Sequence, residues 1–261
     1  MRRVLWLLAA VLPAAAQPKL LINAQLDTRS AASGLESVFR GLVSTQPQPA
    51  WIGYSVPSVR SYNLGCEYVS PGGRTAPGVV HLEPPDQAIV LFRVEGGAVN
   101  RIREVSPDCE IDAGGVPVHW LADVRPADSV ALLSTFDSYF NQTTSAIAMH
   151  ADPAADAALE RMVASTQPEK VRQRAAFWLG AARGRRGFDA AKDLIDRDPS
   201  QSVRQRAVEG IAASKEPEAL DTLIAIARKD NDSRLRRQAV NAISRSRDPR
   251  AQAFLEDVLK R

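Results

Sequence analysis

The sequence predicts a small β-rich α+β unit followed by an all-α solenoid of two-helix repeats. Three observations predict this arrangement. Short β-prone segments broken by Gly and Pro occupy the first half, and a helical motif recurs every 32 residues in the second half. The charge also divides, because residues 17–151 contain 9 basic and 13 acidic side chains whereas residues 152–261 contain 22 and 17. Such asymmetry indicates two segments with different roles.

The overall composition is that of a globular protein. Of 261 residues, 45% are hydrophobic and 24% are charged, which excludes wholesale disorder, collagen and long coiled coils. The formal net charge of +3 is far below the basic excess of a dedicated nucleic-acid-binding protein. We therefore expect no nucleic-acid partner.

Residues 1–16 have the three parts of a bacterial secretory signal peptide. Arg2 and Arg3 precede an apolar run at 4–12, and alanines follow at 14–16. The apolar run is less than half of the about twenty residues that a membrane-spanning helix needs. We expect cleavage after Ala16 and a periplasmic or extracellular protein with no transmembrane segment after cleavage.

The two cysteines, Cys66 and Cys109, both lie in the N-terminal half. In an exported protein an isolated pair predicts a disulfide. Closing a loop of this length stabilises the fold by about 4 kcal/mol in the chain-entropy model. A redox-active or metal-binding pair is the alternative, but the sequence has neither Cys-x-x-Cys spacing nor a His cluster nearby.

Residues 17–125 are predicted to form the α+β unit. Apolar residues recur at helical spacing over 31–44 and predict a helix there. Glycines at 95–98 and 113–115 predict hairpin turns, and Pro117, which cannot donate to a ladder, predicts an edge strand. β-prone runs predict five strands, at 51–56, 79–82, 88–94, 99–105 and 116–121.

The sequence contains no recognisable catalytic constellation. His81 and His119, the histidines of the α+β unit, belong to no nucleophile elbow, HExxH run or metal-ligand spacing. Three alternating carboxylates would share one strand face and offer a cation site, but a solvated acidic face explains them better: Asp108, Glu110 and Asp112. We therefore expect no catalytic residues, no metal and no cofactor.

The second half repeats one helix three times. Residues 171–175, 203–207 and 235–239 are related by displacements of 32 residues, and an apolar residue follows each at the same offset: Leu179, Ile211 and Ile243. A preceding helix is marked by Pro153, Pro217 and Pro249, with Arg185 in the fourth place, because Pro is favoured in the first turn of a helix. We expect three helix pairs over 151–261, a closing helix at 249–259, and a linking or capping helix at 126–150.

This pattern resembles the HEAT-like repeat family, and its short, bilin-lyase-type repeats in particular, over residues 152–261. The resemblance depends on an Asp followed after five residues by Arg, with an apolar residue before the Arg. The motif occurs as Asp198 with Arg204 and as Asp230 with Arg236, whereas the unit of Arg172 has Thr166 in place of the Asp. The resemblance implies that this Asp and Arg form a structural ladder between adjacent repeats, which stops at Thr166. Capture of an anion by the Arg172, Arg204 and Arg236 series is the alternative.

Two other groups of arginines are candidates for contact with a partner. The pattern gives no internal partner to Arg174, Arg206 and Arg237. A basic, glycine-containing turn, expected to protrude, adds Arg183, Arg185 and Arg186.

The sequence therefore predicts a non-catalytic protein that binds or scaffolds another exported or cell-envelope protein, because stacked repeats present an extended surface. One alternative, which the resemblance implies, is a bilin-lyase-like protein or one that handles a small ligand. The other is an envelope module that binds an anionic polymer through the basic half. The modest basic excess of that half makes such an attraction weak at physiological salt.

Overall fold

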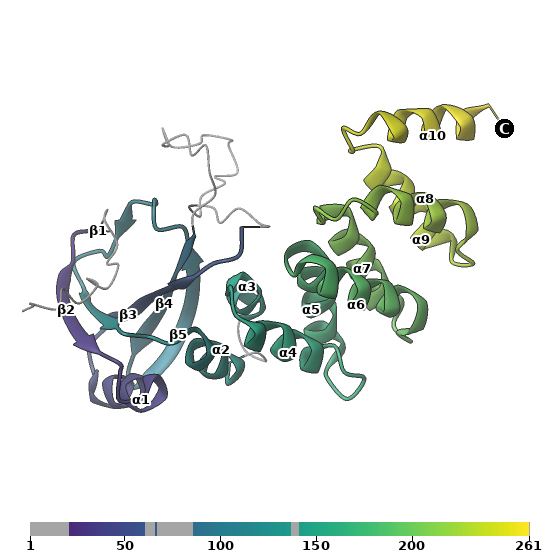
Figure 1. Ribbon diagram of the computed structural model, residues 1–261. Coiled ribbons are helices and arrows are strands. Elements are labelled where there is room, and N and C mark those ends of the chain that lie inside the picture. Colours follow the sequence, from purple (N-terminus) through teal and green to yellow (C-terminus); the bar gives the residue numbers. More distant parts are fainter. Residues whose placement is uncertain (1–20, 61–65, 67–85, 137–140, 261) are drawn as a thin grey trace, which may run out of the picture.

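The computed structural model describes residues 21–60, 66, 86–136 and 141–260 (Figure 1). The predicted signal peptide, the predicted strand at 79–82 and His81 lie outside the described residues. The N-terminal part contains strands arranged in sheets, and the remainder is helical. In Figure 1 the helices extend away from the sheet towards the C-terminus.

A five-stranded sheet forms the centre of the N-terminal part. In spatial order its strands are β2 (Gln25–Ser30), β7 (Pro117–Ala122), β3 (Ala50–Pro57), β4 (Gln87–Glu95) and β5 (Ala98–Val105). The β2–β7 and β7–β3 pairs are parallel, and the β3–β4 and β4–β5 pairs are antiparallel. A separate parallel pair consists of β1 (Leu21–Ile22) and β6 (Ile111–Asp112).

Only one of the two predicted hairpins is present among the described residues. Gly96 and Gly97 have φ values of 60° and 74°, as a two-residue hairpin turn requires, and they join β4 to β5. The prediction at 113–115 was wrong, because β6 pairs with β1 whereas β7 pairs with β2 and β3. The glycines there make a turn between two different sheets.

The prediction that Pro117 marks an edge strand was also wrong. Its strand, β7, lies between β2 and β3. Pro117 is the first residue of the strand, and the pairing with β3 begins only at Val118, opposite Trp51. A proline is tolerated as the first residue of a strand, because the N–H that it lacks lies at the end of the ladder.

The predicted first helix is present as α1 (Leu35–Thr45) and covers one face of the sheet. Phe39 of α1 packs edge-on against Phe92 of β4, with ring centroids 4.7 Å apart. The opposite face of the sheet carries a smaller apolar cluster that contains Trp120 and Cys109. Cys109 is bonded to Cys66, which confirms the predicted pairing of the cysteines. The carboxylates at 108, 110 and 112 do not share one strand face, since β6 contains only Ile111 and Asp112.

Two helices, α2 (Pro126–Ser134) and α3 (Asn141–Met149), occupy the segment predicted as a single capping helix. They belong to the same apolar core as α1 and the sheet. That core continues into the following helices through residues such as Leu159 and Leu179. The sheet and the first helices of the second half therefore share one core.

Seven helices follow as three pairs and a last single helix. The last coincides with the predicted helix at 249–259, and α4 and α10 each begin with the predicted proline. Pro217, in contrast, precedes its helix by two residues. The helices are α4 (Pro153–Met162), α5 (Glu169–Ala182), α6 (Gly184–Arg197), α7 (Gln201–Ala213), α8 (Ala219–Lys229), α9 (Ser233–Ile243) and α10 (Pro249–Leu259).

The second helices of the first two pairs, α5 and α7, approach each other at two glycines. A Cβ atom on Gly210 would lie 2.5 Å from the carbonyl oxygen of Phe177, and one on Gly180 would lie 2.6 Å from the carbonyl carbon of Gly210. Such distances are shorter than van der Waals contact, so only glycine permits this approach.

Candidate interaction surface

The predicted ladder residues Arg172 and Asp198 lie together in the interior. The Nε and Nη2 atoms of Arg172 each donate to a carboxylate oxygen of Asp198 at 3.2 Å, and Nη1 donates to the carbonyl of Gln167 at 3.0 Å. Asp198 also accepts from the backbone N–H of Ser200 at 2.8 Å. Both charged residues are buried. This pair joins α5 to the turn between α6 and α7 and is not available to a ligand.

The next arginine of the series contacts a different aspartate. Nη2 of Arg204 lies 3.2 Å from Asp232, two residues beyond the expected Asp230. The Asp230 carboxylate instead accepts from the backbone N–H of Asp232 at 2.7 Å. The backbone carbonyl of Asp230 accepts from Nη1 of Arg236 at 2.7 Å. The backbone N–H of Arg234 is the main cause of the lowered pKa of Asp232. Arg204 and Asp230 are therefore not brought together.

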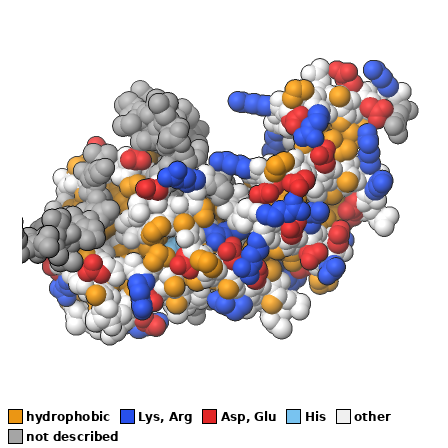
Figure 2. Space-filling view, in the orientation of Figure 1, with side chains coloured by type: hydrophobic (Ala, Val, Ile, Leu, Met, Phe, Trp, Pro, Cys, Tyr) orange, Lys and Arg blue, Asp and Glu red, His pale blue; other side chains and the backbone are white. Residues whose placement is uncertain are grey.

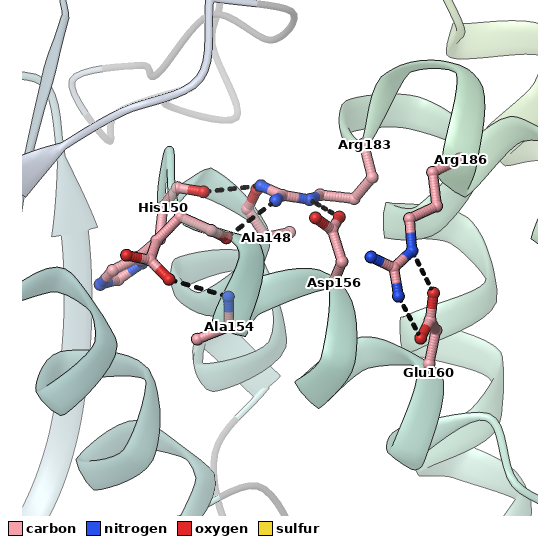
Figure 3. A network of polar contacts seen from close by, with 8 residues as sticks. Ala148, His150, Ala154, Asp156, Glu160, Arg183 and Arg186 are labelled. Atoms are coloured by element: carbon pink, nitrogen blue, oxygen red, sulfur yellow. Dashed lines mark hydrogen bonds and ion pairs between the residues drawn. The ribbon is translucent and has the colours of Figure 1, made fainter.

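Arg183, expected in a protruding turn, is buried at the junction between the helices (Figure 3). Its Nε donates to Asp156 at 2.7 Å, and its Nη1 donates to the carbonyls of Ala148 and His150 at 2.9 and 2.6 Å. The guanidinium group thereby satisfies carbonyls at the C-terminal end of α3, which have no partner within the helix. The expectation of a surface contact was wrong, because these internal acceptors occupy the side chain.

The other two arginines of this segment are exposed but paired. Arg186 donates to both carboxylate oxygens of Glu160 at 2.6 and 2.8 Å (Figure 3). Arg185 donates to Asp189 at 2.9 Å and to Glu218 at 2.5 Å. These carboxylates raise the pKa of both guanidinium groups. The segment begins α6 with Gly184 at a φ of 56° and does not form a protruding turn.

Intramolecular pairing of this kind is frequent over the helical half. Figure 2 shows basic and acidic side chains interspersed there, with hydrophobic side chains between them. The arginines therefore do not form a continuous basic surface on the face that Figure 2 shows.

The three arginines expected to lack internal partners differ from one another. Arg206 forms an ion pair with Glu209 and lies over the ring of Phe177, 4.7 Å from its centroid. Arg174 is half-buried, and its Nη1 is buried without a hydrogen-bond partner. Arg237 is exposed and makes no hydrogen bond or ion pair with any residue that the structure describes.

Arg237 lines an open groove between α7 and α9 with a volume of about 1140 Å³. Polar contacts hold α9 to α7 from the first turns to the middle of α9. Nε2 of Gln238 donates to the Gln205 carbonyl at 3.0 Å and to Glu209 at 2.9 Å, and Nη1 of Arg234 donates to Gln201 at 2.5 Å. Four of these residues, Gln205, Glu209, Arg234 and Gln238, themselves line the groove. The C-terminal ends of the two helices, the start of α8 and the turn before α10 are also part of the lining.

A second polar cluster lies buried between the sheet and the helices. Ser129 of α2 donates to the hydroxyl of Tyr54 at 2.8 Å, and its Oγ lies 2.7 Å from Nε2 of His150. Burial lowers the pKa of His150 to about 4 and raises that of Tyr54 above its usual value. Ser129, Tyr54 and His150 are all fully buried, so the serine and histidine join sheet to helices and are not placed to react with a substrate.

His119 and Glu104 show two further polar environments. His119 is half-buried, with Nδ1 3.2 Å from Asp27 and Nε2 3.1 Å from Gln46. Burial raises the pKa of Glu104 to about 7, against the smaller lowering effect of a hydrogen bond from Ser145 of α3. Within the described ranges, no group of three or more His, Cys, Asp or Glu residues could hold a metal ion.

A family model described as HEAT repeats matches residues 188–261. This match confirms the predicted resemblance to HEAT-like repeats over that segment. The matched HEAT segment begins within α6 and includes all of α7–α10, and thus both walls of the groove. No curated protein and no solved structure matches the chain. Among the described residues, no helix is long and apolar enough to cross a membrane.

Proposed function

We propose that this protein is an exported, non-catalytic binding protein that holds another exported or cell-envelope protein on its helical surface. HEAT repeats generally mediate contacts between proteins. The observation that carries the proposal is the groove between α7 and α9, where exposed Arg237 has no partner among the described residues, whereas Arg185 and Arg186 on α6 are paired with carboxylates.

The proposed surface is the side of a solenoid with a period of 32 residues. The second helices of the three pairs begin at Glu169, Gln201 and Ser233, which are 32 residues apart, and this regular spacing supports the proposal. One helix pair cannot bury its apolar face alone, so stacking of pairs supplies the core and leaves an extended outer surface for binding.

The Cys66–Cys109 disulfide supports export, because disulfides persist in oxidising compartments. The N-terminal sequence supports it as well, through the basic and apolar parts of a signal peptide in residues 1–16. In this proposal the mature chain begins at Gln17 and acts outside the cytoplasm.

Site-specific photocrosslinking in the native cell envelope tests the proposed function. A photoreactive amino acid at Asn241, which lines the groove, is compared with one at Arg197, which is exposed on α6 and does not line it. We expect one discrete protein adduct from position 241 and none from position 197. Excess purified protein without the photoreactive group should compete the adduct away.

Equal adducts from both positions, or none from position 241, would overturn the proposed binding surface. The N-terminal sequence of the purified protein tests export separately. A chain that begins at Gln17 in the periplasm or the medium supports export, whereas an uncleaved chain in the cytosol contradicts it.

A further inference from the structure

The groove between α7 and α9 contains positive charge that the rest of the protein does not neutralise. Arg237 and Arg245 are both exposed, and neither makes a hydrogen bond or ion pair with its side chain to any described residue. Arg234 donates its side chain only to the neutral amide oxygen of Gln201. Three guanidinium groups in the groove therefore have no acidic partner within the described part of the chain.

The acidic residues of the groove are mostly engaged already. Glu209 is paired with Arg206 and accepts from Gln238 at 2.9 Å. Asp248 is paired with Arg250 at 2.8 Å, and this contact lowers the pKa of its carboxyl. Glu216 is the single acidic residue lining the groove that has no ion pair among the described residues. The unpaired positive charge thus exceeds the unpaired negative charge.

The groove also has an apolar component. Ala212 and Ala213 of α7 and Pro217 are exposed in its lining, whereas Leu220 and Leu223 of α8, which also line it, are buried. Its volume of about 1140 Å³ exceeds the range of about 300–1,000 Å³ typical of small-molecule pockets. An open site of this size, with apolar and cationic surface side by side, suits a peptide segment better than a compact ligand.

We propose that the groove binds an extended acidic segment of the partner protein, an inference that rests on the proposed function. Glu or Asp side chains of the segment pair with Arg237 and Arg245, where Arg offers a planar fork that matches a carboxylate. Apolar side chains of the same segment lie over Ala212, Ala213 and Pro217. A uniformly charged polyanion would leave this apolar surface unused and would meet the negative charge of Glu216.

Fluorescence anisotropy with defined peptides and the full mature chain tests this proposal. The probe is a fluorescein-labelled peptide of Glu-Leu-Gly repeats, and its charge-reversed partner consists of Lys-Leu-Gly repeats. We expect the acidic peptide to bind the wild type and Arg237→Glu with Arg245→Glu to weaken this binding by at least about tenfold. The same double variant should bind the basic peptide more tightly than the wild type does.

The matched control applies the same change of charge outside the groove, as Arg161→Glu with Arg197→Glu. Its affinity for the acidic peptide should stay within about twofold of the wild type, and circular dichroism should show that both double variants are folded. Equal loss of affinity in the two double variants would indicate unspecific charge attraction and overturn the proposal. Binding of heparin or duplex DNA in preference to the acidic peptide would overturn it as well.

The photocrosslinking experiment separates failure of this inference from failure of the proposed function. If the adduct at position 241 persists in the Arg237→Glu, Arg245→Glu variant, the protein binds its partner but not through these charges. If position 241 yields no adduct even without these two substitutions, the proposed function itself is wrong. Loss of the adduct in this variant, with retention in the control variant, supports both.

Discussion

The close approach of α5 and α7 makes a sharp prediction for Gly210→Ala. The new Cβ would lie 2.5 Å from the carbonyl oxygen of Phe177 and 3.2 Å from that of Ala176. Both are backbone atoms, so no side-chain rotation relieves the contact, and the helices must move apart. Overpacking of this kind costs about 1–3 kcal/mol, and the better helix propensity of alanine offsets about 1 kcal/mol. We expect a net loss of up to about 2 kcal/mol in the free energy of unfolding.

Urea denaturation followed by circular dichroism at 222 nm measures this loss as a lower midpoint. Gly41→Ala is the matched control, because Gly41 is exposed in α1 and a Cβ there would meet nothing within 4 Å. This variant should be more stable than the wild type by about 0.5–1 kcal/mol. The reasoning is refuted if Gly210→Ala stabilises the protein as Gly41→Ala does, since the helices would then have room for the methyl group.

Two further predictions concern buried charge. Arg183→Met should destabilise the fold by about 3–5 kcal/mol, because it leaves Asp156 and several carbonyls without their buried donor; thermal and urea unfolding measure the loss. The second prediction concerns pH. Between about pH 4.5 and 6.5, His150 should increase the free energy of unfolding as the pH rises, and Glu104 should decrease it, so that the two effects offset each other. Urea midpoints over this range should therefore rise more steeply with pH in Glu104→Gln than in the wild type, and should fall, or rise less, in His150→Gln.

The signs follow from proton uptake in the two states. Unfolded His150 has a pKa near 6.5 and binds protons in this range, whereas the folded form, with a pKa of about 4, stays neutral. Folded Glu104, with a pKa of about 7, holds a proton that the unfolded form, near 4.5, has released. Parallel pH profiles for wild type and both variants would contradict this account. The control for Arg183→Met is Arg186→Met. Arg186 and Glu160 form an exposed ion pair, and its loss should change the free energy of unfolding by less than about 1 kcal/mol.

The helical half was the more predictable part of the sequence. Three copies of one motif mark the same position in three helices, which makes a chance match at all three improbable. The bounds of α10 also agree with the prediction. The strand β2 was missed because all six of its residues are exposed, so it has no alternation of apolar and polar side chains. Its parallel pairing with β7 is a long-range contact that no local pattern reports.

The candidate surface was predictable only in part. The repeat predicted that Arg237 lacks an internal partner, and none is present among the described residues. The same reasoning failed for Arg206, which contacts Glu209 and Phe177. Arg183 looked like a surface residue because its acceptors are carbonyls, which leave no trace in the sequence. The groove depends on how far α9 separates from α7, which no residue pattern reports.

The two larger apolar cores among the described residues both include residues of α5. Val171, Ala175 and Leu179 belong to the core shared with the sheet, whereas Ala176 belongs to the core of the later helices. A fragment that begins at residue 151 would therefore carry α5 without α3, which packs against it, and would expose an apolar stripe to water. Binding studies with such a fragment would report on a newly exposed, adhesive face as well as on the natural surface, and the intact chain avoids this error.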